Sequence, residues 1–240
     1  MVRPVAVITG GSSGIGLAAV KLFCQSGYQV YTCARREFDF AKHVPSDQLC
    51  NIGYQMIDVQ DTRRLADWIH SIGSQSPLDV LINNAAIVHK KPLTEFTSHE
   101  FEQSLSGNLL AALESVKAAI GYFNSQQGGT LINVSSMAAV DPFPGFSVYG
   151  SCKAFLELFT QAMAGELADA RVKSYAIRAG TVETPLLRRV LPDFPSSETL
   201  APFHVAELML ALAQGDMPFP NGSAIEITHD NFDSILSGGE

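Results

Sequence analysis

The sequence is short of positive charge and has no long apolar segment. Lysine and arginine number 16 against 24 aspartates and glutamates, which gives a formal net charge of −8 at pH 7. Binding to a nucleic-acid backbone depends on clustered basic residues, and here they form only scattered doublets. No run of about 18 apolar residues occurs, so we expect no membrane-spanning helix. Neither nucleic acid nor a membrane is therefore an expected partner.

Cysteine and histidine are also sparse, and their spacing forms no site. The four cysteines, Cys24, Cys33, Cys50 and Cys152, make no CxxC motif and no disulfide framework. The six histidines form no HxxxH or HxH pair, so no metal site is expected. The first apolar run, Val5–Ile8, is too short for the core of a secretory signal. Reduced thiols and no export signal together predict a cytoplasmic protein.

Short apolar runs alternate with longer segments of helical period along the chain. The runs predict strands at Val5–Thr9, Gln29–Ala34, Gly53–Asp58, Val80–Asn83, Thr130–Val134, Lys173–Arg178 and Ala224–Thr228. The longer segments predict helices at Ile15–Ser26, Arg63–Ser74, Glu100–Asn124, Tyr149–Ala168 and His204–Gln214. Most of the runs are apolar throughout, as are strands covered by helices on both faces. The alternation predicts an α/β fold with one Rossmann-type, doubly wound parallel sheet of about seven strands.

The chain shows no internal repeat, low-complexity tract or linker, so we expect residues 1–240 to form one domain. Residues 184–203 contain several prolines, which break long helices, and they follow the sixth predicted strand. In an open α/β sheet such an insertion lies near the ligand crevice. It is either a substrate loop or a plain surface loop. Residues 231–240 show no pattern and are expected to fray.

A glycine-rich turn follows the first predicted strand and precedes the first predicted helix. Its glycines have the spacing G-x-x-x-G-x-G. Glycine permits a tight turn and lets bare backbone approach a pyrophosphate, while the N-terminus of the next helix attracts the anion. The turn therefore predicts a dinucleotide site. Its residues are Gly10, Ser12, Ser13, Gly14, Ile15 and Gly16.

The second predicted strand ends at two arginines and has no carboxylate at its tip. NAD-selective sites place an aspartate or glutamate there for the ribose hydroxyls, whereas an arginine accommodates a 2′-phosphate. Arg35 and Arg36 suit a phosphate monoester through charge-assisted bonds, or else they are solvated loop residues. On this reasoning we expect NADP(H) to be preferred over NAD(H).

Tyr149 and Lys153 are four residues apart in a predicted helix, so their side chains share one face. A phenol with a pKa of about 10 is a poor acid or base near neutrality. A neighbouring cation stabilises the phenolate and lowers that pKa, and Lys153 is placed to supply the charge. The pair predicts general acid–base chemistry.

These motifs, in this order, resemble the short-chain dehydrogenase/reductase family over nearly the whole chain. After the glycine turn come Asp58, the sequence Asn83-Asn84-Ala85-Ala86, Asn108, Ser136, Tyr149 and Lys153. Ser136 precedes Tyr149 by thirteen residues, the spacing of the family's catalytic serine, so Ser135 is the weaker candidate. The resemblance implies a nicotinamide cofactor and a small carbonyl or alcohol substrate.

The resemblance also implies roles for single residues. Tyr149 would donate a proton to the carbonyl oxygen in reduction, and Lys153 would lower its pKa and hold the nicotinamide ribose. Ser136 would hydrogen-bond the substrate oxygen, and Asn108 would hold a water that links Lys153 to solvent. Asn108 and Ser136 each have a plainer alternative. The amide of Asn108 could bond its own helix, and Ser136 could serve a strand-end turn.

The other implied roles concern the cofactor. Asp58 would contact the adenine amino group, unless it only caps the following segment, and Asn84 would lie near the adenosine ribose. Residues 180–184 would cradle the nicotinamide amide. The cofactor contacts expected beyond the glycine turn are Arg35, Arg36, Asp58, Val59, Asn84, Ala85, Ala86, Tyr149, Lys153, Gly180, Val182 and Thr184.

The chain departs from the family pattern at three places. Ala86 stands where the family has glycine, and Ala179 stands where it has the proline before Gly180. Losing that proline frees φ, so we expect a looser wall for the nicotinamide. The last predicted strand ends without the family's Asp-Gly-Gly. Since that region often forms subunit contacts, a homodimer stays open beside a homotetramer.

Three functions remain open on the sequence. The leading one is hydride transfer between NADP(H) and a small carbonyl or alcohol, with Tyr149 as general acid/base. The second is an idle NADP(H)-binding sensor or scaffold, which would have no use for proton-transfer residues. The third is a sugar-nucleotide epimerase or dehydratase, which resembles longer chains. We expect an apolar substrate pocket walled by Met137–Phe146, His89–Leu93 and Leu186–Phe203.

Overall fold

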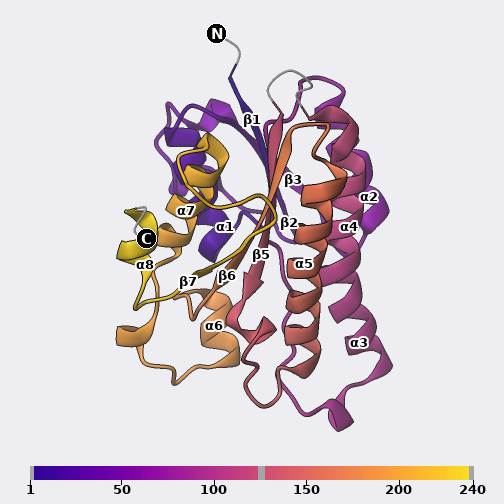
Figure 1. Ribbon diagram of the computed structural model, residues 1–240, viewed down its shortest axis with the longest axis vertical. Coiled ribbons are helices and arrows are strands. Elements are labelled where there is room, and N and C mark those ends of the chain that lie inside the picture. The colour runs from indigo at the N-terminus through magenta and orange to yellow at the C-terminus, as the bar shows by residue number, and fades with distance from the viewer. Residues whose placement is uncertain (1–2, 124–127, 238–240) are drawn as a thin grey trace.

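Seven parallel strands form one sheet in the computed structural model, which describes residues 3–123 and 128–237 (Figure 1). The strands are β1 (Val5–Thr9), β2 (Gln29–Ala34), β3 (Ile52–Met56), β4 (Val80–Asn83), β5 (Gly129–Ser136), β6 (Val172–Ala179) and β7 (Ala224–Ile227). Their order across the sheet is β3-β2-β1-β4-β5-β6-β7. The winding direction reverses between β1 and β4, the point where doubly wound folds bind ligands.

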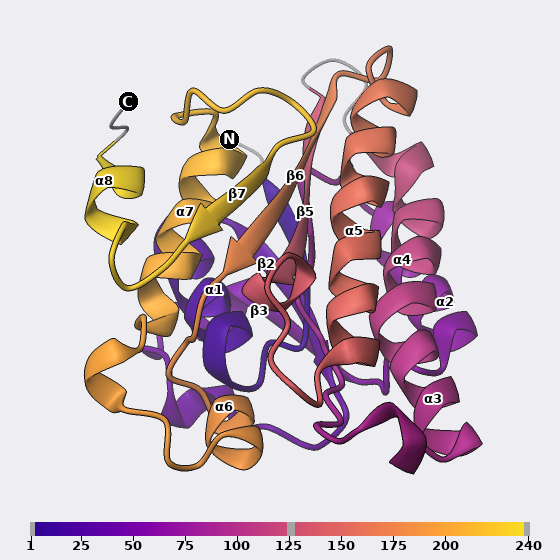
Figure 2. The ribbon, with the colours of Figure 1, turned by 60° about the horizontal axis from the view of Figure 1, so that its bottom comes forward.

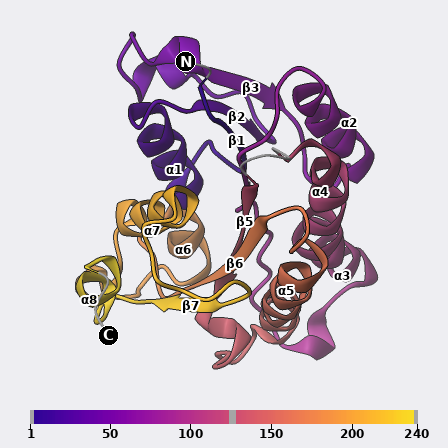
Figure 3. The ribbon, with the colours of Figure 1, turned by 45° about the horizontal axis from the view of Figure 1, so that its top comes forward.

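Helices cover both faces of this sheet (Figure 3). On one face lie α1 (Gly14–Gln25) and α7 (Pro202–Gln214), which pack against each other. On the other face lie α2 (Thr62–Gly73), α4 (Ala111–Ala119) and α5 (Ser147–Glu166). The shorter helices are α3 (Ser98–Leu105), α6 (Pro185–Val190) and α8 (Phe232–Leu236). The fold is thus the Rossmann-type doubly wound sheet that the sequence predicts.

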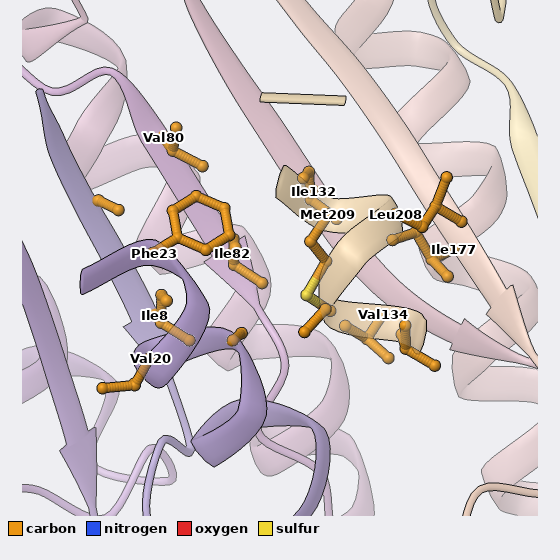
Figure 4. Packing of buried hydrophobic residues seen from close by; sticks show 14 of the residues in the cluster. Ile8, Val20, Phe23, Val80, Ile82, Ile132, Val134, Ile177, Leu208 and Met209 are labelled. Carbon is orange, nitrogen blue, oxygen red and sulfur yellow. The ribbon is translucent and has the colours of Figure 1, made fainter. Parts of the chain in front are cut away.

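Apolar side chains fill the space between the sheet and each helical layer. Figure 4 shows the layer under α1 and α7, where Phe23 lies over Ile8 and Ile82, and Met209 lies beside Ile132. All five side chains are fully buried. Burying one side chain of this size stabilises the fold by roughly 1.5–3 kcal/mol, so these contacts fix both helices on the sheet.

A chain of hydrogen bonds crosses the interior between the sheet and α5. Asn83 Nδ2 donates to Asn133 Oδ1 (2.9 Å), and Asn133 Nδ2 donates to Thr160 Oγ1 (2.9 Å). The hydroxyl of Thr160 donates to the Leu156 carbonyl (2.7 Å). Asn83 and Asn133 lie opposite each other in the pairing of β4 with β5. Because an unbonded buried amide is costly, this chain fixes β4, β5 and α5 relative to one another.

The prediction of one continuous helix over Glu100–Asn124 is wrong, because the segment is interrupted. A π-helical turn, Ser106–Leu110, separates α3 from α4, and a 3₁₀ turn follows α4. Asn124 lies outside the described residues. Within the π turn, Gly107 lies so close to Ile87 that a Cβ would come 2.4 Å from Ile87 Cδ1. This close contact joins the turn to a residue from another part of the chain, and the spacing of apolar residues along the predicted helix does not reveal it.

Two short helices form where the sequence predicts none. The Thr184 hydroxyl accepts the Leu187 N–H (3.1 Å) and Pro185 follows, so α6 begins inside the proline-containing segment. Figure 2 shows α6 at the end of the sheet to which β6 points. Part of the tail that is expected to fray forms α8, whose Phe232 ring stacks on His204 of α7 at 4.0 Å. Residues 238–240 lie outside the described residues.

Candidate active site

A cavity of about 590 Å³ opens at the carboxyl ends of the strands, on both sides of the point between β1 and β4. This volume lies within the usual range for sites that hold small molecules and cofactors. All the predicted cofactor and catalytic residues line it except Gly16 and Asn108. The fold therefore brings residues from Gly10 to Thr184 to one place.

The glycine turn has the geometry that a bound pyrophosphate needs. Gly10 has φ +76° and Gly14 has φ +52°, backbone conformations that favour glycine. Ser13 is the N-cap of α1, and its side chain makes no capping hydrogen bond. The first N–H groups of α1 are therefore left for an anion. Gly16 supports the turn from behind, since a Cβ there would come 2.3 Å from the Gly10 carbonyl oxygen.

Asn84 and Thr9 hold this turn against the end of β4. Asn84 Nδ2 donates to the carbonyl oxygens of Thr9 (2.9 Å) and Gly10 (3.3 Å). The Thr9 hydroxyl accepts the backbone N–H groups of Asn84 (3.0 Å) and Ala85 (3.1 Å). Asn84 thus positions the glycine turn as well as lining the cavity. The role of Thr9 is not predicted from the sequence, because it depends on contacts with a residue 75 positions away along the chain.

The end of the cavity beside β2 and β3, where the resemblance would place the adenosine (the adenosine end), carries both charge signs. Arg35 and Arg36 are exposed and line it together with Asp58 and Val59. Glu37, which the sequence reasoning missed, lines it as well. Asp58 accepts the Gln60 backbone N–H (3.1 Å), and it does not cap α2, whose N-cap is Asp61. The Gln60 side-chain amide also donates to both carboxylate oxygens of Asp58, at 3.3 Å and 3.2 Å, so this carboxylate lies at the cavity wall with Gln60 as its partner.

Ser136, Tyr149 and Lys153 meet at the other end of the cavity. The hydroxyls of Ser136 and Tyr149 are hydrogen-bonded to each other. Lys153 Nζ donates to the Val134 carbonyl oxygen (2.6 Å) and lies 5.6 Å from the centre of the Tyr149 ring. Ser136 ends β5 and the other two residues share one face of α5, so two elements of the fold fix all three.

Burial changes the proton affinity of both α5 residues. It raises the pKa of Tyr149 to about 12, although the hydrogen bond with Ser136 opposes this change. It lowers the pKa of Lys153 to about 8, because an ammonium group loses its hydration. The resemblance implied a lowered pKa for Tyr149, but burial dominates in the structure. At neutral pH the phenol keeps its proton, the form that can donate in a reduction.

Asn108 lies in the π turn and outside the main cavity. Its Oδ1 accepts the Ile87 N–H (3.0 Å), and its Nδ2 donates to the carbonyl oxygens of Ile87 (2.9 Å) and Ser104 (2.9 Å). Both amide N–H groups are therefore used, one of them within its own helix. A space of about 10 Å³, about enough for one water, lies beside it. A water held at Asn108 would have to bond its backbone or the second lone pair of Oδ1.

An ionic group that sequence reasoning missed lies behind the catalytic end. Arg178 of β6 donates to both carboxylate oxygens of Glu157, at 3.0 Å and 2.7 Å. The Ser135 hydroxyl donates to Glu157 (2.8 Å) and contacts the Lys153 carbonyl oxygen (3.2 Å). These bonds join β5, α5 and β6 beside Ser136, Lys153 and Ala179. In the sequence, only the four-residue spacing between Lys153 and Glu157 indicates that Glu157 lies on the same helix face as the catalytic lysine.

Replacing Glu157 with glutamine is expected to destabilise the fold by about 2 kcal/mol, because the largely buried Arg178 loses the nearer of its two carboxylate partners and keeps the more distant Glu226 at 3.6 Å. In a chain of this size that loss lowers Tm by roughly 4–8 °C. Thermal unfolding followed by circular dichroism measures it. Glu114→Gln is the matched control, since its ion pair with Lys117 is exposed and should contribute about 0–1 kcal/mol. Equal Tm values for the two variants would contradict this expectation.

The backbone at Ala179 and Gly180 is held by the sheet even though Ala179 replaces the family's proline. It belongs to β6 and lies opposite Ile227 of β7, and the Gly180 N–H donates to the Ile227 carbonyl oxygen (2.8 Å). Sheet hydrogen bonds thus hold the position where the family has proline.

The substrate end of the cavity has apolar walls, as expected, but not from all the predicted segments. The apolar wall residues are Ile87, Val88, Met137, Phe143, Phe146, Leu186, Leu187, Val190 and Leu191. The predicted wall segment His89–Leu93 lies outside this lining, as do Pro144 and residues 192–203 of the last predicted segment. Among residues 3–123 and 128–237, no group of three His, Cys, Asp or Glu side chains could hold a metal ion. In the same ranges no helix has the length and apolar character to cross a membrane.

Comparison with known proteins points the same way as this geometry. The family described as short chain dehydrogenase matches residues 4–193. L-xylulose reductase from Bos taurus is 32% identical over 185 residues, which are 75% of this chain and 72% of that protein.

Solved structures of similar proteins also contain nicotinamide cofactors. One described as "ElxO with NADP Bound" has a TM-score of 0.83 at 27% identity and covers 97% of this chain and 100% of its own. The 3-ketoacyl-(acyl-carrier-protein) reductase from Brucella melitensis, complexed with NADH, has a TM-score of 0.83 at 26% identity, with 94% and 96% coverage. Fold, cavity and sequence match agree, and the chain belongs to the short-chain dehydrogenase family of oxidoreductases.

Proposed function

We propose that this protein transfers a hydride between NADP(H) and a small carbonyl or alcohol, acting as a carbonyl reductase or alcohol dehydrogenase. The observation that carries the proposal is the arrangement of the cavity. A proton donor, Tyr149, lies at one end with Ser136 and Lys153, and an uncapped helix N-terminus behind a glycine turn lies at the other. An idle sensor or scaffold gains nothing from this donor arrangement.

The chemistry divides between cofactor and protein. The nicotinamide supplies the hydride. The Tyr149 hydroxyl, protonated at neutral pH, donates its proton to the substrate oxygen. The Ser136 hydroxyl hydrogen-bonds the same oxygen and stabilises the charge that develops on it. The ammonium group of Lys153, held by the Val134 carbonyl oxygen, stabilises the tyrosinate left behind.

The residues also fit the cofactor that the proposal requires. The turn of Gly10 and Gly14 and the first N–H groups of α1 would hold the pyrophosphate, and Arg35 and Arg36 would hold the 2′-phosphate. The nearby Glu37 is the one carboxylate in the lining that directly follows these arginines. The described residues thus offer two cations against one anion beside the 2′ position.

Replacing Arg35 with alanine is expected to lower the ratio of kcat/KM for NADPH to kcat/KM for NADH by about tenfold or more, because one charged hydrogen-bond donor to the phosphate is lost. Steady-state kinetics with both cofactors measure the ratio. Arg64→Ala, which removes an exposed arginine on α2 outside the cavity, is the control. An unchanged ratio in the Arg35 variant would refute the assigned preference.

The proposal as a whole is tested by nicotinamide absorbance with NADPH and NADH over a panel of aldehydes, ketones, quinones and diketones. Turnover that prefers NADPH supports it. Tight NADPH binding with no turnover of any carbonyl would replace it with the sensor or scaffold function. Assembly into a homodimer or homotetramer stays a prediction.

A further inference from the structure

The guanidinium group of Arg188 holds together the segment between β6 and α7. Two of its nitrogens pair with the carboxylate of Glu183, through Nε at 2.7 Å and through Nη2. Nη1 donates to the carbonyl oxygens of Pro192 (3.2 Å) and Phe194 (2.6 Å), and Nη2 also donates to Ser196 Oγ (2.7 Å). All five N–H donors of an arginine are therefore used.

These bonds give α6 a fixed place beside the cavity. The Glu183 N–H donates to the Leu200 carbonyl oxygen (2.9 Å), and the Leu200 N–H donates to the Thr181 carbonyl oxygen (2.8 Å). The segment is thus bonded at both ends as well as at Arg188. It is a preformed wall, so the backbone of α6 is in place beside the cavity before a substrate binds.

Arg189, the next residue, differs from Arg188 in its exposure, its position relative to the cavity and its bonding. It lines the cavity together with Leu186, Val190 and Leu191. It is exposed, and across the described ranges it has no hydrogen bond or ion pair. The fixed segment thus places an uncompensated cation beside an apolar surface.

The charge of the cavity is opposite to that of the chain. The chain has a net charge of −8, yet the described lining residues include four basic side chains and two acidic ones. Both acidic residues, Glu37 and Asp58, belong to the adenosine end. Arg35, Arg36 and Lys153 have roles in the proposed reaction, and Arg189 is the basic residue of the lining without one.

We propose that Arg189 binds an anionic group of the substrate, and that the substrate is an apolar or aromatic carbonyl compound that carries a carboxylate. This inference rests on the proposed function for the carbonyl but not for the anion. The apolar walls bind the body of such a molecule, and a charge-assisted hydrogen bond to a guanidinium holds its carboxylate. The other source of an anion in this cavity is a phosphate of the cofactor, and the two sources predict different results.

The test uses a matched pair of unreactive ligands, 1-naphthoate and 1-naphthamide, titrated calorimetrically into the full-length protein saturated with NADPH. The wild type is expected to bind the carboxylate about tenfold or more tightly than the amide, since hydrogen bonds between charged groups exceed neutral ones by this margin. Arg189→Gln is expected to remove this preference and to leave the amide Kd within about twofold. Arg189 is exposed, so the variant should fold. Arg64→Gln, outside the cavity, should behave as the wild type.

Two results would overturn the inference. One is equal binding of the two ligands by the wild type, including no binding of either. The other is a preference for the carboxylate that survives in Arg189→Gln. If that variant instead weakens NADPH binding about tenfold and keeps the preference, Arg189 serves a cofactor phosphate.

A kinetic pair separates this inference from the proposed function. Benzoylformate and its methyl ester share one ketone and differ in charge. Turnover of both compounds with equal kcat/KM would refute the anion site and would still support the proposed reductase activity. A preference for the carboxylate in the titration, without turnover of any carbonyl compound, would refute the proposed reductase activity and would still support the anion site.

Discussion

Tyr149→Phe is expected to lower kcat for carbonyl reduction by a factor of about 10²–10⁴, the usual contribution of a positioned general acid. The variant loses only the hydroxyl that bonds Ser136. Its ring keeps the edge contact with Phe146 at 6.1 Å and the position of Lys153 over its face. We therefore expect the Kd for NADPH to change by less than about twofold, since the lost group acts on the transition state.

The control for this result is a tyrosine outside the cavity. Tyr122 lies in the 3₁₀ turn after α4, and its hydroxyl has no hydrogen bond within the described ranges. Tyr122→Phe should keep kcat within about twofold, as surface changes away from a site do. A Tyr149→Phe variant with more than about a fifth of the wild-type kcat would mean that the proton comes from another group.

Lys153→Met is expected to abolish activity and yet stabilise the fold at pH 7. Lys153 is 2% exposed, and burial lowers its pKa from 10.5 to about 8. A difference of 2.5 pH units at about 1.4 kcal/mol each amounts to about 3 kcal/mol of cost to the folded state. Methionine removes that cost but leaves the Val134 carbonyl oxygen without its donor, which takes back about 1–2 kcal/mol. The net gain in the free energy of unfolding is then about 1–2 kcal/mol.

The gain depends on pH in a direction set by proton binding. Below pH 8 the folded and unfolded wild type both carry the Lys153 proton, so the full cost is present. Between about pH 8 and 10.5 the folded state releases the proton first and the unfolded state binds more protons, so wild-type stability rises with pH. The methionine variant lacks this rise, so its advantage should vanish at about pH 9–9.5, and near pH 10.5 the wild type should be the more stable protein by about 1–2 kcal/mol.

Urea unfolding of both proteins at pH 7 and pH 10 measures the effect. Lys117→Met is the control, because Lys117 is 78% exposed and its replacement should change stability by less than about 0.5 kcal/mol at either pH. A Lys153→Met variant that is less stable than the wild type at pH 7 would show that burial of this ammonium group costs less than its hydrogen bond to Val134 contributes, and would contradict the expectation.

The fold could be predicted from the sequence because its strands and helices differ in length and pattern. The strands β1, β2 and β4 have the predicted bounds, since each is a short, largely apolar run that ends where glycine or polar residues begin. Tyr149, Lys153 and Ser136 meet because the helical period and the strand end place them on adjoining elements. The doubly wound order then follows from the alternation of strands and helices.

The sequence could not reveal contacts between distant segments. Nothing in the residues around Asn108 indicates a π turn, because Ile87, which bonds it, belongs to another part of the chain. The Arg178–Glu157 pair and the use of all donors of Arg188 depend in the same way on how loops return to the sheet. The sequence does not distinguish Arg188 from Arg189, and only their contacts in the folded protein show that the two side chains differ in function.

The paired amides of Asn83 and Asn133 have a consequence for how the chain finds its native arrangement. β4 and β5 are largely apolar, so sliding one strand past the other by two residues would keep the same faces buried at little loss. Such a misaligned sheet would break the hydrogen bond between the two amides and leave the buried Asn83 side chain without this partner. The misaligned sheet therefore has a higher free energy than the native one, and two small polar side chains favour the correct strand register while the chain folds.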